Sequence, residues 1–167
     1  MIKINIKKLT ALTILLLAFS SCDLEPLESA QEVAEGGGTL DTYTAYTINS
    51  TDPSGSNVNG RIVFWKTDLD QTLVQISLYN TVPDLLHPAL VLEGPAGSGG
   101  PIMITLDEVS GDTGELEENK FFLISDTSFY DGILTMDSHI NIYLSGTDDT
   151  IVATGDLGVN ADPVESN

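Results

Sequence analysis

The chain has 167 residues, of which 41% are hydrophobic, and its 25 acidic side chains against six Lys and Arg give a formal net charge of −19 at pH 7. The length suits one domain with a tail, and the apolar fraction is that of a folded protein, so the acidity does not indicate global disorder. The shortage of positive charge argues against a nucleic-acid partner, because such proteins need a basic surface for the phosphates. The single Cys excludes an internal disulfide, a Cys-based zinc site and an iron–sulfur centre.

Residues 1–21 have the composition of a secretory signal peptide. Three lysines within residues 1–8 precede a nearly continuous apolar run over residues 9–19, and two serines follow. A basic start, a short apolar run and small residues before a cleavage point are the parts of such a signal. The run is shorter than the ~20 apolar residues of a membrane-spanning helix. We therefore predict a targeting segment that is absent from the mature protein.

The only cysteine, Cys22, follows this segment directly. Phe19-Ser20-Ser21-Cys22 resembles a bacterial lipobox, in which the Cys thiol is lipidated and the chain is cut just before it. The commonest form has Leu where Phe19 stands and Gly or Ala where Ser21 stands. A secreted protein with a chance Cys is the alternative, but the position at the end of the signal favours lipidation. Stable anchoring needs more than one acyl chain, which a diacylglyceryl, N-acylated Cys22 supplies.

Residues 22–38 are predicted to be a flexible tether. They are acidic, contain a proline and end in three glycines. Asp23 and Glu25 resemble the surface-export signals of some Gram-negative lipoproteins, although a solvated linker explains them equally well. After cleavage three basic residues remain against 25 acidic ones, a formal charge of −22. Anionic lipid headgroups repel such a surface, so the lipid on Cys22 must hold the protein at the membrane.

From residue 39 onward, apolar and polar side chains alternate as they do in β-strands. Val74, Ile76 and Leu78 fall on one face, for example, and Gln75 and Ser77 on the other. Clusters of Asp, Pro, Ser and Gly separate the alternating runs. Strands are expected near 39–48, 57–67, 72–79, 89–93, 102–107, 119–125, 138–144 and 150–155. This spacing predicts an all-β fold, an antiparallel sandwich or barrel of seven or eight strands over 39–160, followed by a frayed tail at 161–167.

One segment late in the chain breaks the alternation. Ser128 followed three residues later by Asp131 is similar to a capping box, which begins a helix. Phe129, Ile133 and Met136 then fall on one helical face. We predict a short crossover helix here.

Three stretches, taken in order, resemble the CHRD domain, a family named after chordin and common in bacterial secreted proteins and lipoproteins. They are His87-Pro-Ala-Leu-Val-Leu-Glu-Gly94, then Gly99-Gly-Pro-Ile-Met-Ile-Thr-Leu106 with Val109-Ser-Gly-Asp-Thr-Gly114, then Asp137-Ser-His-Ile-Asn-Ile-Tyr-Leu-Ser145 leading into Ile151-Val-Ala-Thr-Gly-Asp-Leu-Gly158. The resemblance covers about residues 57–160. It implies an all-β Greek-key domain that is distantly similar to copper/zinc superoxide dismutase and has no generally assigned molecular role.

The histidine motif of that family is degenerate in this chain. The family reads His-Pro-Ala-His-Ile-His-x-Gly and later Ile-Asn-Val-His-Leu-Ser, whereas here Leu90 and Leu92 replace the His-x-His pair and Tyr143 the later His. A His-x-His pair places two imidazoles on one strand face, as copper or zinc requires, and Leu has no lone pair to donate. We predict no transition metal there and no cofactor. His87 keeps a family position, but two scattered histidines, His87 and His139, are more often structural or solvated than metal-binding.

Acidic turns are candidates for calcium, a hard cation that takes several oxygen ligands. The candidates are Asp68 with Asp70 and Asp148 with Asp149, besides an acidic run over residues 107–118. No segment has EF-hand spacing, and Asp-x-Asp is common in hairpin turns. A solvated acidic loop is therefore the favoured interpretation.

Enzyme motifs are absent from the sequence. There is no Gly-x-Ser-x-Gly elbow, no His-Glu-x-x-His and no thiol in the folded domain, and the glycine-rich segment 94–101 lacks the Lys and the helix of a phosphate loop. Paired carboxylates for glycosidic chemistry stay open, since their separation is a three-dimensional fact. We predict that the protein is not an enzyme.

Trp65 beside Tyr43, Tyr46 or Tyr79 is a candidate sugar-binding platform, although aromatic residues on strands more often pack in the core or across strands. The sequence as a whole predicts a lipid-anchored β-sandwich of the cell envelope, an outer-membrane lipoprotein that binds an unidentified protein or glycan partner. The alternative is a calcium-dependent adhesion or carbohydrate-binding domain. A third hypothesis is an enzyme, either a hydrolase or a metal-free relic of dismutase-like chemistry.

Overall fold

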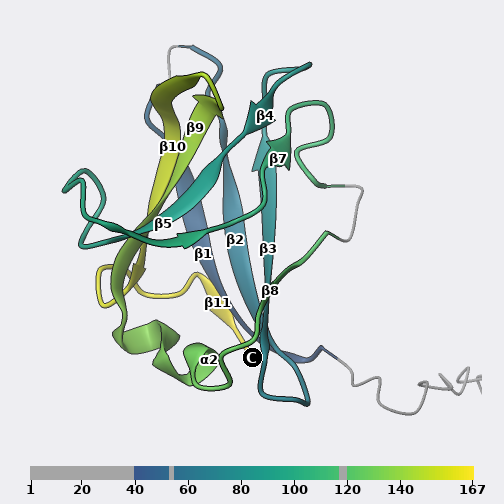
Figure 1. Ribbon diagram of the computed structural model, residues 1–167, viewed down its shortest axis with the longest axis vertical. Helices are drawn as coiled ribbons and strands as arrows, with labels where there is room; N and C mark the ends of the chain where they lie inside the picture. The colour runs from purple at the N-terminus through teal and green to yellow at the C-terminus, as the bar shows by residue number, and fades with distance from the viewer. Residues whose placement is uncertain (1–39, 53–54, 117–119) are drawn as a thin grey trace, which may run out of the picture. The chain divides into compact units, whose positions relative to one another are not determined.

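The alternating segments form one curled antiparallel sheet, which the computed structural model describes over residues 40–52, 55–116 and 120–167 (Figure 1). The predicted signal segment, Cys22 and the predicted tether lie outside the described residues. The main strands are β1 (Thr42–Ser50), β2 (Asn59–Lys66), β3 (Thr72–Tyr79), β5 (Ala89–Glu93), β6 (Ile102–Thr105), β8 (Phe122–Ile124), β9 (Asp137–Ser145) and β10 (Asp148–Gly158). They are arranged in the order β6-β5-β9-β10-β1-β2-β3-β8 and curl into a half-barrel, which confirms the all-β prediction.

Three short strands complete the architecture. β4 (Leu86–His87) pairs with β7 (Val109–Ser110) in a separate two-stranded sheet, and β11 (Glu165–Ser166) pairs with β1. On one side β1 pairs with β2. On its other side the first half of β1 pairs with β11 and its end with β10.

The predicted fraying of the tail at 161–167 is wrong. The Asn167 N–H donates to the Tyr43 carbonyl at 3.0 Å, and the Tyr43 N–H donates back to the Asn167 carbonyl at 3.1 Å. Because β10 covers only the end of β1, the start of β1 would otherwise present unpaired main-chain groups at an edge. The last residues of the chain occupy that edge.

The predicted crossover helix is present, but it lacks the predicted cap. It consists of α2 (Phe129–Gly132), which continues into a 3₁₀ turn (Ile133–Thr135). Ser128 makes no side-chain bond to the helix; its hydroxyl donates to Asp126 Oδ1 at 2.8 Å, and bonds from Ser128 lower the pKa of Asp126. Ile133 is buried in the core, and Phe129 and Met136 pack against it, as the helical face predicted.

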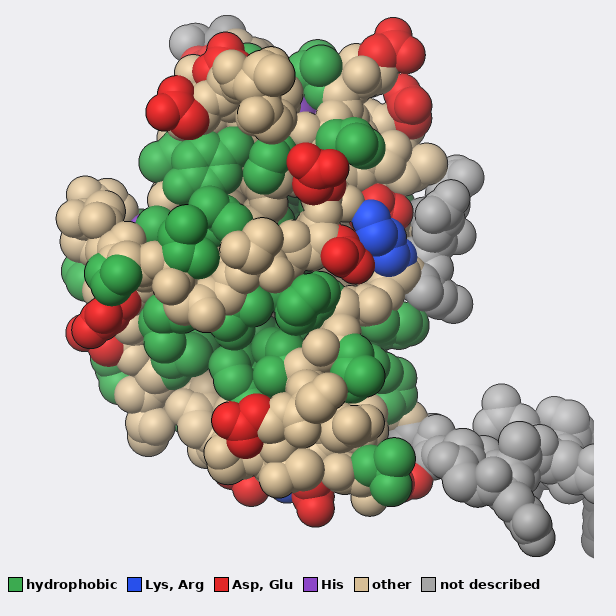
Figure 2. Space-filling model, viewed as in Figure 1, with side chains coloured by type: hydrophobic (Ala, Val, Ile, Leu, Met, Phe, Trp, Pro, Cys, Tyr) green, Lys and Arg blue, Asp and Glu red, His purple; other side chains and the backbone are tan. Residues whose placement is uncertain are grey.

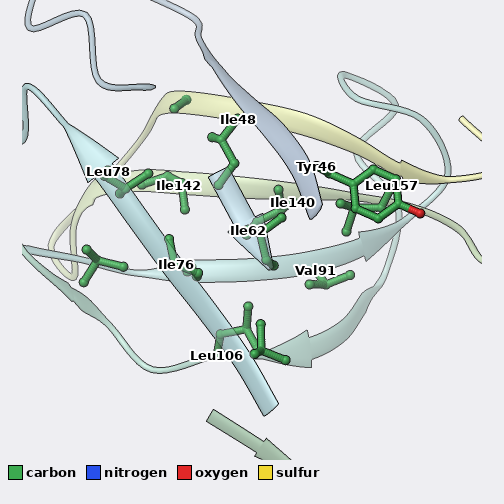
Figure 3. Close-up of a cluster of buried hydrophobic side chains, with 14 of the residues drawn as sticks. Tyr46, Ile48, Ile62, Ile76, Leu78, Val91, Leu106, Ile140, Ile142 and Leu157 are labelled. Carbon is green, nitrogen blue, oxygen red and sulfur yellow. The ribbon is translucent and has the colours of Figure 1, made fainter. Parts of the chain in front are cut away.

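The core fills the inside of the curl (Figure 3). Side chains that point inward from β1, β2, β3, β5, β9 and β10 meet there, and they include Tyr46, Ile48, Ile62, Phe64, Ile76, Leu78, Val91, Ile140, Ile142 and Leu157. Burial of one such side chain contributes about 1.5–3 kcal/mol. The alternation that places these residues inside places their sequence neighbours on the outer face of the sheet.

The surface is unevenly charged. On the face where β5 and β6 lie in front, hydrophobic side chains occupy much of the middle, and acidic ones lie mostly toward the margin (Figure 2). Ile102 and Met103 of the edge strand β6 are 58% and 47% exposed. Within the described part of the chain, no helix has the length and apolarity to cross a membrane.

Candidate binding face

The register of β1, β2 and β3 arranges their outward side chains in rows that run across the sheet. Opposed residues in an antiparallel pair share a face, so each row is a set of neighbours. In order from the start of β1, the rows are Tyr43–Trp65–Leu73, Ala45–Val63–Gln75 and Thr47–Arg61–Ser77, and the first row continues to Leu123 of β8. Ala45 and Val63 of the middle row are buried, so the accessible part of the face is apolar around Tyr43 and Trp65 and polar around Thr47 and Arg61.

Two of the predicted platform residues come together on this face. The rings of Tyr43 and Trp65 lie 4.8 Å apart between centroids at an angle of 41°, and both side chains are half-buried. Such pairs contribute about 0.5–1.5 kcal/mol beyond the area that they bury. Tyr46 instead points into the core, where it meets Phe64 edge-on at 6.3 Å, and Tyr79 lies exposed at the far end of β3.

A carboxylate from the C-terminal strand fixes the position of Tyr43. The Tyr43 hydroxyl donates to Glu165 Oε1 at 2.8 Å, and Arg61 Nη1 approaches Glu165 Oε2 at 3.3 Å. The hydrogen bond to the carboxylate raises the pKa of Tyr43 above its ordinary value, with a smaller contribution from burial. The Arg61 and Glu165 side chains remain 57% and 53% exposed, so both can still reach a ligand.

Glu165 is the residue of the candidate face that the sequence analysis missed. It stands in a polar segment of seven residues, Ala161-Asp-Pro-Val-Glu-Ser-Asn167, that shows no alternation and contains a proline. Its place on the face follows from the pairing of Ala45 with Glu165, a contact between residues far apart in the chain. A two-residue strand is too short to be recognised from its pattern.

An open groove lies beside the Tyr43–Glu165–Arg61 network. Its lining includes polar side chains from all three strands, namely Thr47, Asn59, Arg61, Gln75, Ser77 and Tyr79. Among the described residues that line it, Arg61 alone is charged. At its base a Cβ on Gly60 would lie 2.0 Å from the Ser77 carbonyl oxygen, so glycine allows β2 and β3 to approach there. The groove thus offers hydroxyl, amide and guanidinium groups next to an aromatic pair.

The two histidines, in contrast to the polar side chains of the groove, are both completely buried. His87 Nε2 accepts the Val82 N–H at 3.2 Å, and His87 Nδ1 lies 3.0 Å from the Tyr143 carbonyl. A carbonyl only accepts, so Nδ1 carries the proton and the imidazole is neutral. His139 Nδ1 donates in the same way to the Gly94 carbonyl at 2.7 Å. Both side chains tie strands to the main chain of other segments.

Two of the three positions at which the sequence departs from the CHRD histidine motif line a second hollow. Leu90 of β5 and Tyr143 of β9 line it together with Pro88 and the turn at 145–149, whereas Leu92 lies buried opposite His139. Leu90 and Tyr143 are therefore neighbours in space, and they present an alkyl chain and a phenol to this hollow.

The calcium candidates lie far apart. Asp68 and Asp70 occupy the turn between β2 and β3, next to the start of β1, where Asp70 pairs with Lys66 at 3.4 Å. Asp148 and Asp149 begin β10, near the end of β1, about 30 Å away along a nine-residue strand. Asp148 Oδ1 accepts the Thr150 N–H at 3.0 Å, and bonds from Thr150 lower its pKa. In the described ranges, no group of three or more His, Cys, Asp or Glu residues is placed to hold a metal ion.

No family model matches this chain, and no curated protein matches it. The resemblance to the CHRD domain stays a prediction from the sequence.

Proposed function

We propose that this protein is an outer-membrane lipoprotein of a bacterial cell envelope, anchored through Cys22, and that its β-domain is a non-enzymatic binding module. The binding surface in this proposal is the outer face of β1, β2 and β3. The observation that carries it is the Tyr43–Glu165–Arg61 network, which holds exposed polar groups and an aromatic ring in place beside an open groove.

Preorganisation is the physical reason to assign binding to this face. Ordering a side chain on binding costs about 0.5–1.5 kcal/mol, and a group already held in position avoids part of that cost. Tyr43 is held twice, by its contact with Trp65 and by its bond to Glu165. Ligand sites combine apolar and aromatic surface with a few polar groups in fixed positions, and this face has both.

The proposal of a non-enzymatic role is supported by the histidines. Histidine is the commonest general acid or base in enzymes, and it must reach the substrate to act. Here the side chains of His87 and His139 are inaccessible, and each imidazole bonds to main-chain groups. Their geometry is that of structural links.

The anchoring is tested by metabolic labelling with palmitate. The wild-type chain is expected to take up label and to sediment with membranes, and a Cys22→Ala variant to lose both properties. A Ser20→Ala variant, which keeps the cysteine, is the matched control and is expected to behave like the wild type. An unlabelled wild type together with a Cys22→Ala variant that fractionates like it would contradict the anchoring.

The binding face is tested by sedimentation of the purified full chain, held in detergent micelles, with insoluble envelope material from the producing cells. We expect the Arg61→Ala and Gln75→Ala double variant to sediment less than the wild type. Thr105→Ala, an exposed substitution on β6, is the control and should change nothing. Equal sedimentation of all three proteins would remove the assignment of this face.

A further inference from the structure

We infer that the outer face of β1, β2 and β3 binds a neutral glycan chain, which extends from the Tyr43–Trp65 pair into the groove beside Arg61. This inference rests on the proposed function, since it names the ligand of the same face.

The aromatic end of the face suits a sugar ring. A pyranose presents a flat surface of C–H groups, which are apolar and pack on the negative face of an aromatic ring. Tyr43 and Trp65 are half-buried and held against each other, so they form a fixed platform and not two mobile side chains. Leu73 and the exposed Leu123 continue the same row and extend the apolar surface.

The polar end of the face suits the hydroxyl groups of a sugar. Each hydroxyl both donates and accepts, and planar groups with two neighbouring donors or acceptors bind adjacent hydroxyls in pairs. The face carries three planar groups, the Glu165 carboxylate, the Arg61 guanidinium and the Gln75 amide, and Ser77 lies opposite Arg61 in the register. Donors and acceptors therefore alternate over a short distance.

The separation of the two ends indicates an oligosaccharide. Trp65 and Arg61 are four residues apart on the same side of β2, which is about 13 Å along a strand. The aromatic pair and the groove therefore contact different units of one chain, and a single sugar unit does not span both.

Charge favours a neutral glycan over an anionic one. Residues 40–167 hold 20 acidic side chains against three basic ones, so a polyanion is repelled from the domain as a whole. On the face itself the charge of Arg61 is balanced by its pairing with Glu165. A neutral, polyhydroxylated chain makes the same hydrogen bonds without this repulsion.

The sheet topology disfavours an extended peptide. Peptides that add to a sheet bind at an open strand edge, through main-chain hydrogen bonds. β2 lies at the centre of this face, and it pairs with β1 over Gly60–Lys66 and with β3 along its whole length. A ligand on this face therefore meets side chains, which a glycan uses and strand addition does not.

The single tryptophan provides a direct test, because Trp65 is the only one in the chain and reports on this face alone. Full-length protein in detergent micelles is titrated with maltohexaose, cellohexaose, mannohexaose and chitohexaose, with polygalacturonate as the anionic probe. We expect a saturable change in Trp65 fluorescence with at least one neutral hexamer. Arg61→Ala and Gln75→Ala should each weaken it, Arg61→Ala by about tenfold or more, because a hydrogen bond to a charged group is lost. Thr105→Ala should leave it unchanged.

Calorimetry with Trp65→Phe and Trp65→Ala separates stacking from folding. Phenylalanine keeps an aromatic face and should retain most of the affinity, whereas alanine should abolish binding, with circular dichroism as the check that each variant is folded.

The proposal is overturned if no neutral hexamer gives a saturable signal at millimolar concentration, if polygalacturonate binds more tightly, or if the face variants bind like the wild type. If envelope sedimentation depends on Arg61 and Gln75 but no neutral hexamer competes, the glycan is wrong and the binding face stands. If the double variant also sediments normally, both proposals fall.

Discussion

Two regions of the molecule use polar side chains in opposite ways. Around β5 and β9, His87 and His139 are completely buried. Both ring nitrogens of His87 bond to the main chain, at Val82 and Tyr143, and His139 Nδ1 bonds to the Gly94 carbonyl. On β1, β2 and β3 the polar side chains are exposed or half-buried at the surface of a groove. A buried polar group is costly unless it is bonded, so the first set is committed to structure and the second is available to a ligand.

This difference bears on the resemblance to the CHRD domain. The positions that resemble the CHRD histidine motif lie near β5 and β9, where Leu90 and Tyr143 line one hollow and the buried His87 links β4 to β9. The candidate binding face lies on other strands and contains none of these positions. A function that CHRD domains perform through their histidine motif would therefore not describe the site proposed for this chain.

The largest expected effect on stability comes from removing the buried side chain of His87. His87→Ala leaves the Val82 N–H and the Tyr143 carbonyl without their partner and opens a cavity. An unsatisfied buried group costs about 1–3 kcal/mol, so we expect the free energy of unfolding to fall by about 3 kcal/mol. Urea denaturation measures this fall. Leu86→Ala, at the exposed neighbouring position, is the control, and an equal loss in both variants would show that His87 is not a structural link.

The next effect concerns the main chain beneath the groove. Gly60→Ala places a Cβ 2.0 Å from the Ser77 carbonyl oxygen, so β2 and β3 must move apart. Overpacking of this kind costs about 1–3 kcal/mol. The variant should be less stable in urea and should also lose envelope binding, whereas Gly132→Ala, with open space around it, should do neither. A fully stable Gly60→Ala variant would mean that the strands are not this close.

A third substitution breaks a structural hydrogen bond between β10 and the glycine-rich segment without opening a cavity. Asp156 Oδ1 accepts the Ala96 N–H at 2.6 Å and holds the glycine-rich segment against β10. Asp156→Asn keeps the shape but replaces a charged acceptor with a neutral one, a loss of about 1 kcal/mol. Amide exchange at Ala96 should accelerate, while exchange in β2 stays unchanged. Asp149→Asn, at an exposed position near the start of β10, is the control, and unchanged protection of Ala96 would contradict the link.

Alternation predicted the strands well wherever inward and outward positions differ in polarity. β3 begins and ends at the predicted residues, since Val74, Ile76 and Leu78 are all buried. β10 extends to Gly158, past its predicted end at residue 155. The prediction stopped there because Gly155 interrupts the alternation of apolar and polar residues. A Cβ there would lie 2.3 Å from the Thr47 carbonyl, so the glycine is required by a close approach of β1 and β10. That approach is a tertiary fact, which the local sequence does not contain.

The candidate site was predictable in part, from the same alternation of side chains along a strand. Tyr43 and Tyr46 are three residues apart on one strand, so they must point to opposite faces, and only one of them can join Trp65. The strand register then selects Tyr43. Glu165 was out of reach, because its place depends on a pairing between the two ends of the domain.

The smallest effect on stability comes from Glu165→Gln. This variant also tests directly whether Glu165 holds Tyr43 in place on the outer face of β1, β2 and β3. The pair with Arg61 is exposed, so the loss at neutral pH should be below about 1 kcal/mol. The carboxylate raises the pKa of Tyr43, however, so the variant should lower that pKa toward its ordinary value. Tyrosinate absorbance measures it, as the difference between titrations with and without a Tyr43→Phe substitution.

The sign of the associated stability change follows from linkage. A folded-state pKa above the unfolded value means that folding favours the protonated phenol, so this contribution is fully present below about pH 10 and is lost as the pH rises through the folded pKa. The wild type should therefore lose stability more steeply than Glu165→Gln in that range. If Tyr43 titrates alike in both proteins, Glu165 does not hold it in solution, and the aromatic pair is no longer a fixed platform. The outer face of β1, β2 and β3 would then be merely exposed, and its contrast with the histidine-linked surface would no longer indicate a binding site.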